Sequence, residues 1–450
     1  MKHHHVRRLG LTLLALATAV ALTACSGGSP AATTATTGGT ATGSAPADYT
    51  GQTFTVWHYE SANSAMGLAW AKAVDIFKTE HPGITVNVEP QTFEQIQKNA
   101  KIILTGDTVP DVMEYNKGNA TAGQLASQGL LTPLTDVAKA RGWDKIVTGA
   151  LATTAMYNDQ GLMGSGDWYG VTNYGEYVTV YYNKDMFDAQ GLKVPTTYDQ
   201  FVAAMQTFVA AGITPLAAGG AEYPMQQIWY QLVLSQSNRD FVNAYQLFNG
   251  DVDWQSDAMI GATDTLRDWV DKGYISKDAA GLTAEDMGTS FIAGKYPIMM
   301  SGSWWFGRLK SEIKFNWGQF LFPGNELNTG SSGNLWVVPD SAKNKDLAYD
   351  FIDITLRPEV QNILGENGGL PVSGDPAGIT DESVRVFTQN FQTAVNNDQL
   401  AFYPDWPVAG FYDQLVSGFQ SVVNGTKSSQ EVMSTLGDYY KSGKADIVGG

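Results

Sequence analysis

The first part of the chain alternates short strand-like segments with amphipathic helical segments, and this alternation constrains the fold more than any other feature. β-Branched and aromatic residues cluster at 54–57, 84–88 and 110–113. Between these clusters, apolar residues recur at helical spacing over 66–77 and 93–104. Strands that alternate with helices of this length indicate βαβ units and a parallel sheet, so we expect an α/β fold. The length of 450 residues is enough for two lobes.

The ends of these strands are candidate ligand positions. In open α/β sheets, ligands bind beyond the carboxyl ends of the strands, which here are residues 57–59 and 114–116. A third candidate lies within 169–187, where polar residues at 172–176 precede a β-branched and aromatic run at 178–182. The run predicts a buried strand, whose Tyr181 and Tyr182 we expect in the core. Glu176 just before it is either part of an ordinary loop or part of a ligand site.

The first 47 residues predict export and anchoring. Lys2, Arg7 and Arg8 precede an apolar segment at 11–22, which is too short to cross a bilayer of about 30 Å. The segment ends in Leu-Thr-Ala-Cys at 22–25, which resembles the lipobox of bacterial lipoproteins. We expect a lipoprotein signal peptide at 1–24 and lipidation of Cys25. Residues 25–47, rich in Ala, Thr, Gly and Ser, predict a flexible tether; an ordinary signal peptide is the alternative.

The charge of the chain argues against some partners. Residues 1–24 hold three basic residues and no acid, so the rest carries a formal charge of −20, three below the −17 of the whole. A body this acidic is a poor partner for nucleic acid or for an anionic membrane surface. Cys25 is the single cysteine, so no intramolecular disulfide forms.

The sequence predicts neither an enzyme nor a cofactor site. Beyond the signal segment it has two histidines, His58 and His81, and none of the zinc-protease, P-loop, nucleophile-elbow or dinucleotide-binding motifs. A calcium-loop-like stretch at 251–262 lacks the glycine and the final glutamate that such loops need, so we expect no metal. Glycoside hydrolysis alone stays open, because it needs only two facing carboxylates.

Aromatic residues in loops next to polar side chains are abundant. They occur at 301–305, 333–336 and 403–406, in a chain with 12 Trp and 20 Tyr. A ring stacked on the apolar face of a sugar buries ~50 Å², worth about 1 kcal/mol, so several rings and directed hydrogen bonds are needed. The composition therefore fits a sugar site without requiring one.

An ordered set of segments resembles the extracellular solute-binding proteins (family 1) of ABC transporters, the maltose-binding-protein type. The matching segments are 81–86, 105–112, 129–134, 169–187, 191–198, 291–304 and 368–372. The resemblance covers nearly all of the body in order, from about residue 50 to about 440. One departure is Thr172, where this family usually has proline.

The resemblance implies a periplasmic-binding-protein-like α/β fold with two discontinuous lobes and a ligand cleft between them. It places the N-terminal lobe at 48–175 and 318–367, and the C-terminal lobe at 176–317 and 368–450. The chain would cross between lobes near 175–176, near Gly318 and near 366–370. It further implies hinge closure on an oligosaccharide, delivery to an ABC permease, a monomer, and anchoring to the outer face of the cell membrane.

The resemblance and the chain positions together give a set of candidate ligand-binding residues. Matched positions give Tyr115, Glu176, Glu222, Tyr223, Trp304 and Tyr412. Position alone adds Trp57, His58, Asn63, Asn116, Asn334, Trp336, Asp405 and Trp406. For each aromatic residue the sequence leaves open whether the ring packs in the core or faces the ligand. A secreted glycan-degrading enzyme and a binding protein for a non-sugar solute remain as alternative functions.

Overall fold

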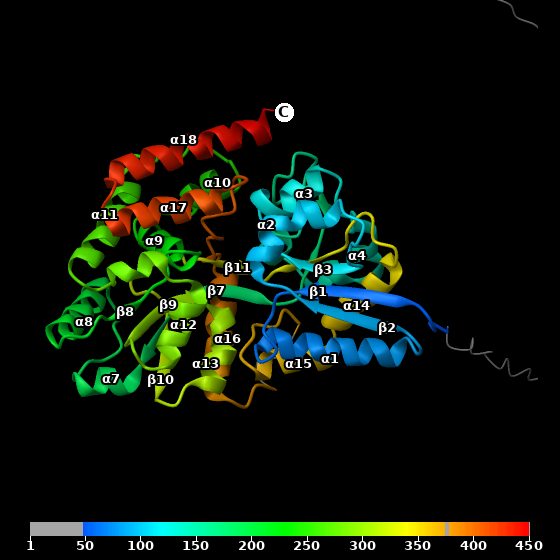
Figure 1. The fold of residues 1–450 in the computed structure, drawn as a ribbon, viewed down its shortest axis with the longest axis horizontal. Coiled ribbons are helices and arrows are strands. Elements are labelled where there is room, and N and C mark those ends of the chain that lie inside the picture. The colour runs from blue at the N-terminus through cyan, green and yellow to red at the C-terminus, as the bar shows by residue number, and fades with distance from the viewer. Residues whose placement is uncertain (1–47, 374–377, 450) are drawn as a thin grey trace, which may run out of the picture. The chain divides into compact units, whose positions relative to one another are not determined.

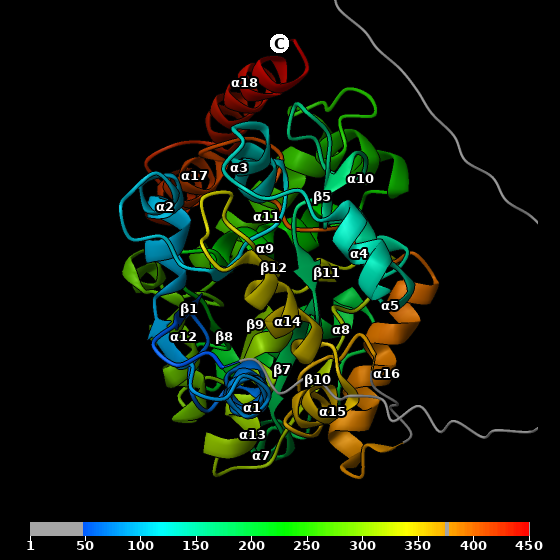
Figure 2. The same ribbon diagram turned by 90° about the vertical axis from the view of Figure 1, so that its right-hand side faces the viewer.

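A computed structural model describes residues 48–373 and 378–449 (Figures 1 and 2). These residues form two five-stranded mixed β-sheets with helices packed around them. None of the helices in these residues is long and apolar enough to cross a membrane.

The first sheet has the strand order β2-β1-β3-β12-β6. Its strands are β1 (Thr53–His58), β2 (Thr85–Pro90), β3 (Val112–Tyr115), β6 (Val171–Thr172) and β12 (Leu335–Val337). β1 is parallel to β2 and β3, as the alternating pattern predicts, whereas β12 is antiparallel to β3 and β6. Helices α1 (Ala65–Glu80), α2 (Phe93–Leu104), α14 (Lys345–Thr355) and α15 (Pro358–Glu366) complete what we call the first lobe.

The second sheet has the order β10-β7-β9-β8, with β11 also paired to β7. Its strands are β7 (Gly175–Asn183), β8 (Leu216–Ala217), β9 (Ile298–Gly302), β10 (Trp317–Phe320) and β11 (Gly330–Ser332). Helices α9 (Pro224–Leu234), α11 (Asp257–Asp271), α12 (Ala284–Ile292), α13 (Phe306–Glu312), α16 (Glu382–Asn396) and α17 (Phe411–Asn424) complete the second lobe.

The remaining elements are shorter or peripheral. They are α3 (Gln124–Ser127), α4 (Thr135–Arg141), α5 (Trp143–Ile146), α6 (Ala150–Thr153), α7 (Lys184–Ala189), α8 (Tyr198–Ala210), α10 (Arg239–Gln246), α18 (Ser429–Val448), the strand pair β4 (Met156–Tyr157) and β5 (Asp167–Trp168), the π-helical turn η1 (Asn119–Gly123), and the 3₁₀ turns η2 (Lys277–Gly281) and η3 (Ser303–Trp305).

Local sequence explains where α1 begins and ends. Ser64 is the N-cap, and its hydroxyl accepts a hydrogen bond from the amide of Gly67 at 2.9 Å. Trp70, Val74 and Phe77 recur at helical spacing and are buried against the sheet. The helix ends at Glu80, two residues before Pro82, which cannot continue it. The apolar face of α1 thereby fixes this helix to the first lobe.

Trp336, which the sequence proposes for the ligand site, lies in the core of the first lobe. Its side chain is 1% exposed, and its ring contacts Trp70 and Phe351 with centroids 5.5 and 5.2 Å apart. Trp336 is the middle residue of β12, an interior strand, so its ring points into the layer beneath α1 and α14. The proposed ligand role is therefore wrong.

Three segments cross between the sheets side by side. The first runs from β6 to β7 through Tyr174, and the second from β11 to β12 through Gly333. The Gly333 amide donates to the Tyr174 carbonyl at 2.6 Å, and the Gly175 amide donates to Leu370, in the third segment, at 2.7 Å. Adjacent crossings of this kind are the arrangement in which a few backbone rotations can bend one lobe against the other.

The sequence analysis places the second crossing near Gly318, but the structure has it elsewhere. Gly318 lies in β10 and pairs with Tyr182 of β7, so this part of the chain still belongs to the second sheet. The change of sheet occurs between Ser332, which pairs with Gly175, and Leu335, which pairs with Tyr115. The sheet partner of so short a strand depends on tertiary pairing, which local sequence does not contain.

The substitution Trp336→Ala should lower the free energy of unfolding by about 3–5 kcal/mol, because it leaves a cavity among Trp70 and Phe351. Urea denaturation measures this change. Ile102, on α2, is 70% exposed. Ile102→Ala is therefore the control and should change stability by less than about 0.5 kcal/mol. A Trp336→Ala cost as small as that of the control would contradict the core assignment.

Candidate ligand-binding cavity

A cavity of about 480 Å³ lies between the two lobes. The first lobe contributes residues that follow β1 and β3 and the start of α2. The second lobe contributes residues around the starts of α9, α12 and α13 and the loop before α17. Its volume falls within the ~300–1,000 Å³ typical of small-molecule sites, and junctions between lobes are a common place for them.

Nine of the residues proposed from sequence line this cavity. They are Asn116, Glu176, Glu222, Tyr223, Trp304, Asn334, Asp405, Trp406 and Tyr412. They come from positions up to 296 residues apart in the chain, between Asn116 and Tyr412. The fold thus brings residues from both lobes, including Tyr412 of α17, to one cavity.

The other five proposed residues, Trp57, His58, Asn63, Tyr115 and Trp336, do not line the cavity. Trp57 and Tyr115 fail for a shared reason, which is that they are still paired within the sheet, with Glu89 and Leu335 respectively. The residues that follow the last ladder pair are free to turn toward the other lobe. The cavity is therefore lined one or two residues later, at Tyr59 and Glu60 after β1 and at Asn116 and Lys117 after β3.

His58 and Asn63 take structural roles instead. His58 Nδ1 accepts a hydrogen bond from the amide of Glu60 at 3.2 Å, and burial lowers the pKa of His58 to about 4, so its ring is neutral at pH 7. Asn63 donates to Glu312 Oε1 at 2.7 Å and thereby links the first lobe to α13.

Lys117, which the sequence analysis missed, is the central charge of the cavity. Its Nζ donates to Glu176 Oε2 at 2.7 Å, and the two side chains are only 2% and 6% exposed. It also donates to Asn334 Oδ1 at 3.0 Å, and it lies 5.6 Å and 5.3 Å from the ring centroids of Tyr403 and Trp406. A buried ammonium needs such partners, since water cannot solvate it there.

The lysine pair continues into a network of hydrogen bonds across the hinge. Asn334 Nδ2 donates to the hydroxyl of Tyr174 at 2.9 Å, and this hydroxyl donates to Glu114 Oε1 at 3.2 Å. Glu176 is in β7 of the second sheet and Glu114 is in β3 of the first. The network therefore ties the two sheets together at the level of the crossings. In the sequence, the one feature that could have pointed to Lys117 is its position just after the end of β3.

The half-buried Glu60 and the buried Glu114 form a pair of carboxyl groups beside this network. Burial, followed by the charge of Glu176, raises the pKa of Glu60 to about 7. Burial and the charge of Glu60 raise the pKa of Glu114 well above its ordinary value. Two adjacent buried carboxylates repel each other, so at least one of them holds a proton near neutral pH.

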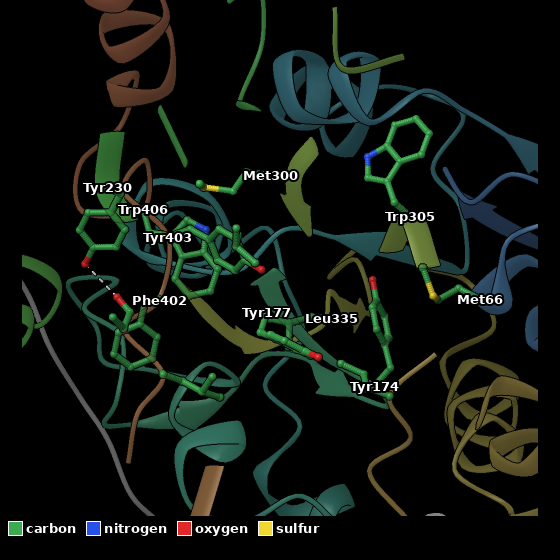
Figure 3. Close-up of a cluster of buried hydrophobic side chains, with 14 of the residues drawn as sticks. Met66, Tyr174, Tyr177, Tyr230, Met300, Trp305, Leu335, Phe402, Tyr403 and Trp406 are labelled. Atoms are coloured by element: carbon green, nitrogen blue, oxygen red, sulfur yellow. Dashed lines mark hydrogen bonds between the residues drawn. The ribbon is translucent and has the colours of Figure 1, made fainter. Parts of the chain in front are cut away.

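Aromatic rings form much of the remaining wall. Trp304 is half-buried at the turn after β9; its Nε1 donates to the hydroxyl of Tyr223 at 3.1 Å, and the two rings meet edge to face at 5.6 Å. Figure 3 shows Tyr403 and Trp406 next to each other; their centroids are 5.2 Å apart. Tyr230 supports this loop, because its hydroxyl donates to the carbonyl of Ala401 at 2.9 Å.

Contacts between the lobes also enclose the cavity. The hydroxyl of Tyr412 on α17 donates to Glu94 Oε1 on α2 at 2.6 Å. The rings of Phe93 and Tyr223 approach to 6.4 Å edge to face. These four residues line the cavity and come from opposite lobes. A ligand that reaches the interior would have to pass these contacts.

The family model described as bacterial extracellular solute-binding protein matches residues 72–375. The chain belongs to this family. The resemblance stated from sequence is thereby confirmed. Because the family is one of binding proteins, the expectation that the protein is not an enzyme is confirmed as well.

Individual relatives are more distant. A probable sugar-binding periplasmic protein of Mesorhizobium japonicum is 28% identical over 268 residues, covering 57% of this chain and 60% of the relative. A multiple sugar-binding protein of Streptococcus mutans is 29% identical over 204 residues, covering 43% and 48%. The match thus spans less than two thirds of the length of these relatives.

Solved structures confirm the fold. A chitin oligosaccharide binding protein aligns with a TM-score of 0.75 at 21% identity, covering 87% of this chain and 99% of that one. The GacH receptor of Streptomyces glaucescens aligns with a TM-score of 0.72 at 23% identity, covering 87% and 98%. The protein therefore has the α/β fold of solute-binding proteins, with two mixed sheets.

Within residues 48–373 and 378–449, no three His, Cys, Asp or Glu side chains are placed to hold a metal ion. The signal peptide, Cys25 and the tether at 25–47 lie outside the described residues.

The substitution Lys117→Met should lower the free energy of unfolding by about 3–5 kcal/mol, because it leaves Glu176 buried without its cation. Glu176→Gln should also destabilise, and the double variant should lose less than the sum of the two. Lys272 pairs with Asp268 on the surface, where both side chains are 49% exposed. Lys272→Met is the matched control, with a change of about 0.5 kcal/mol or less. Additive single costs in urea denaturation would contradict the pairing.

The raised pKa of Glu60 predicts a dependence of stability on pH. Between about pH 4.5 and 7, the folded state binds more protons at this site than the unfolded state, so the free energy of unfolding falls as pH rises. Glu60→Gln should remove part of this decline, and the variant that also carries Glu114→Gln should remove more. Glu326→Gln, at an exposed position, is the control. The measurement is urea denaturation across this range; a pH profile unchanged by Glu60→Gln would be inconsistent with a buried, protonated carboxyl.

Proposed function

We propose that this protein is the substrate-binding lipoprotein of a bacterial ABC importer and that it captures an oligosaccharide between its two lobes. The observation that carries the proposal is the composition of the cavity wall. The half-buried ring of Trp304 and the buried rings of Tyr403 and Trp406 line the cavity together with hydrogen-bonding side chains such as Asn116 and Asp405. A sugar presents the complementary surface, with apolar C–H faces and a rim of hydroxyl groups.

The energetics favour a multi-ring site of this kind. One stacked ring contributes about 1 kcal/mol, which does not offset the cost of association. Three rings together with hydrogen bonds from both lobes can do so. The printed names of the Mesorhizobium japonicum and Streptococcus mutans relatives, both sugar-binding, point to the same class of ligand.

The hinge supplies the link between binding and transport. Ligand contacts from both lobes are complete only when the lobes are together, so a sugar binds the closed form more tightly and shifts the population toward it. The permease would recognise this closed form. We propose that Glu176, at the start of β7 beside the first crossing, holds a sugar hydroxyl and moves with the hinge.

The remaining parts of the proposal follow from the N-terminal segment. Lipidation of Cys25 would hold a monomer at the outer face of the cell membrane, with residues 25–47 as a tether. The lobe boundaries are proposed at 175–176 and, after the correction at Gly318, at 333–334, with the third near 366–370. Of the alternatives, a non-sugar solute remains for the test below, whereas a glycan-degrading enzyme does not fit a family of binding proteins.

Titration of an oligosaccharide panel, followed by tryptophan fluorescence, tests the proposal. Trp304→Ala should weaken binding by at least about 1 kcal/mol, because it removes a stacking face, and should leave the protein folded. Trp336→Ala is the matched control, because it removes the same side chain from the core and should lower stability without changing affinity. The outcome that would refute the proposal is no response to any sugar together with a response to a peptide or a polyamine.

A further inference from the structure

The charges that line the cavity are unbalanced. Among its lining residues, six are acidic and two are basic: Glu60, Glu94, Glu176, Glu222, Glu285 and Asp405 against Lys117 and Arg308. Glu60 is partly protonated near neutral pH, but the other acidic side chains still outnumber the two basic ones, and a neutral ligand gives no reason for this excess. The excess therefore bears on which saccharide the cavity takes.

Both cations in the wall are already engaged by carboxylates of the protein. Lys117 pairs with Glu176 at 2.7 Å. Arg308 contacts both oxygens of Glu285, at 2.8 and 3.1 Å, and pairs with Glu312 at 3.2 Å. Neither cation is available to neutralise another carboxylate at contact distance.

Three of the other carboxylates, those of Glu94, Asp405 and Glu222, line the cavity together with Tyr412. Glu94 accepts a hydrogen bond from the Tyr412 hydroxyl at 2.6 Å, and burial followed by the charges of Glu94, Asp405 and Glu222 raises the pKa of Tyr412. We call these three residues the acidic cluster. They come from α2, from the loop before α17 and from the segment before α9, so the cluster draws on both lobes.

Asp405 is the member of the cluster that has no ion-pair partner. It is 9% exposed, and its carboxylate forms no ion pair with any described residue. Burial raises the pKa of Asp405 to about 6; a hydrogen bond from its own backbone amide and the charge of Lys117 oppose this shift, and the charge of Glu94 adds to it. Glu94, by contrast, has Lys98 at 3.1 Å on the exposed side, and Glu222 accepts from the amide of Ala284 at 2.8 Å.

A second polar group in the same wall also lacks a partner. Gln227, one turn into α9 from Tyr223, is 3% exposed, and its Oε1 accepts no hydrogen bond from the described residues. A buried acceptor without a donor costs about 1–3 kcal/mol. A buried carboxylate without an ion-pair partner costs more, and the cost falls when a cation binds. Both groups would be satisfied by a donor that carries positive charge.

We propose that the saccharide bound in this cavity carries a protonated amine, and that its ammonium group is held by the acidic cluster with Asp405 as the principal partner. The ring that bears the amine lies against the aromatic wall beside Trp304. This inference rests on the proposed function, because it names the class of saccharide within the same cavity. Hydrogen bonds to an ionised partner are about twice as strong as neutral ones, which gives the amine its advantage over a hydroxyl group.

Three β-1,4-linked tetrasaccharides that differ only at C2 test the inference: one carries free amines, one acetamido groups and one hydroxyl groups. Isothermal titration calorimetry at near-neutral pH measures the affinity of the full mature protein for each. The amine form should bind at least about ten-fold more tightly than the other two, the factor that corresponds to one additional charge-assisted hydrogen bond.

Variants locate the effect. Asp405→Asn should remove the preference for the amine, so that the three sugars bind with affinities within about two-fold of one another. Asp413, two residues into α17 from its start, is exposed and outside the cavity. Asp413→Asn is the matched control and should keep the full preference. A preference that survives Asp405→Asn would overturn the assignment of the ammonium site.

The failure of this inference and the failure of the proposed function give different results. Equal affinities for the three sugars, or binding of the neutral forms alone, would overturn the inference and leave saccharide binding standing. If none of the three sugars binds, the inference is overturned. Saccharide binding would still stand if a wider panel contained a neutral sugar that binds. Binding of spermidine, with no saccharide bound in either experiment, would overturn both.

Discussion

The buried ion pair between Lys117 and Glu176 is the interaction on which the arrangement of the two lobes depends. Lys117 follows the last strand residue of β3, and Glu176 is the second residue of β7, so the pair joins the two sheets where the chain crosses between them. The pair fixes the relative position of the two sheets rather than adding net stability, because the desolvation of two buried charges costs about as much as their attraction gains. If the lobes shifted so that the pair separated, each charge would be buried without its partner.

The cavity follows from this constraint. The Lys117 ammonium lies over the rings of Tyr403 and Trp406 and so links their loop to the crossing. Asn334 and Tyr174 complete the hydrogen-bond network on the hinge side. The space that remains between the lobes is walled by rings and carboxylates from both. Because the wall is shared, any ligand that fills it favours the closed arrangement, which is the property that a transport receptor requires.

Sequence patterns predicted the fold well and the site in part. The alternation of β1, α1, β2, α2 and β3 is local, and it predicted the parallel part of the first sheet. Glu176 and Trp304 were identified because they follow recognisable segments. The sequence could not show that Trp336 lies in the core and Trp406 at the cavity, because this depends on which helices or loops cover each ring. Lys117 and Glu60 were missed because their importance arises only when distant loops meet.

The central claim is that the cavity between the lobes holds the saccharide. The most direct measurement is a crystal structure of the protein with the sugar that binds most tightly in solution. The account predicts a sugar ring stacked on Trp304, with hydroxyl or amine groups within hydrogen-bond distance of Asp405 and Glu176. A sugar bound outside the cavity, without contact to Trp304, Asp405 or Glu176, would contradict it.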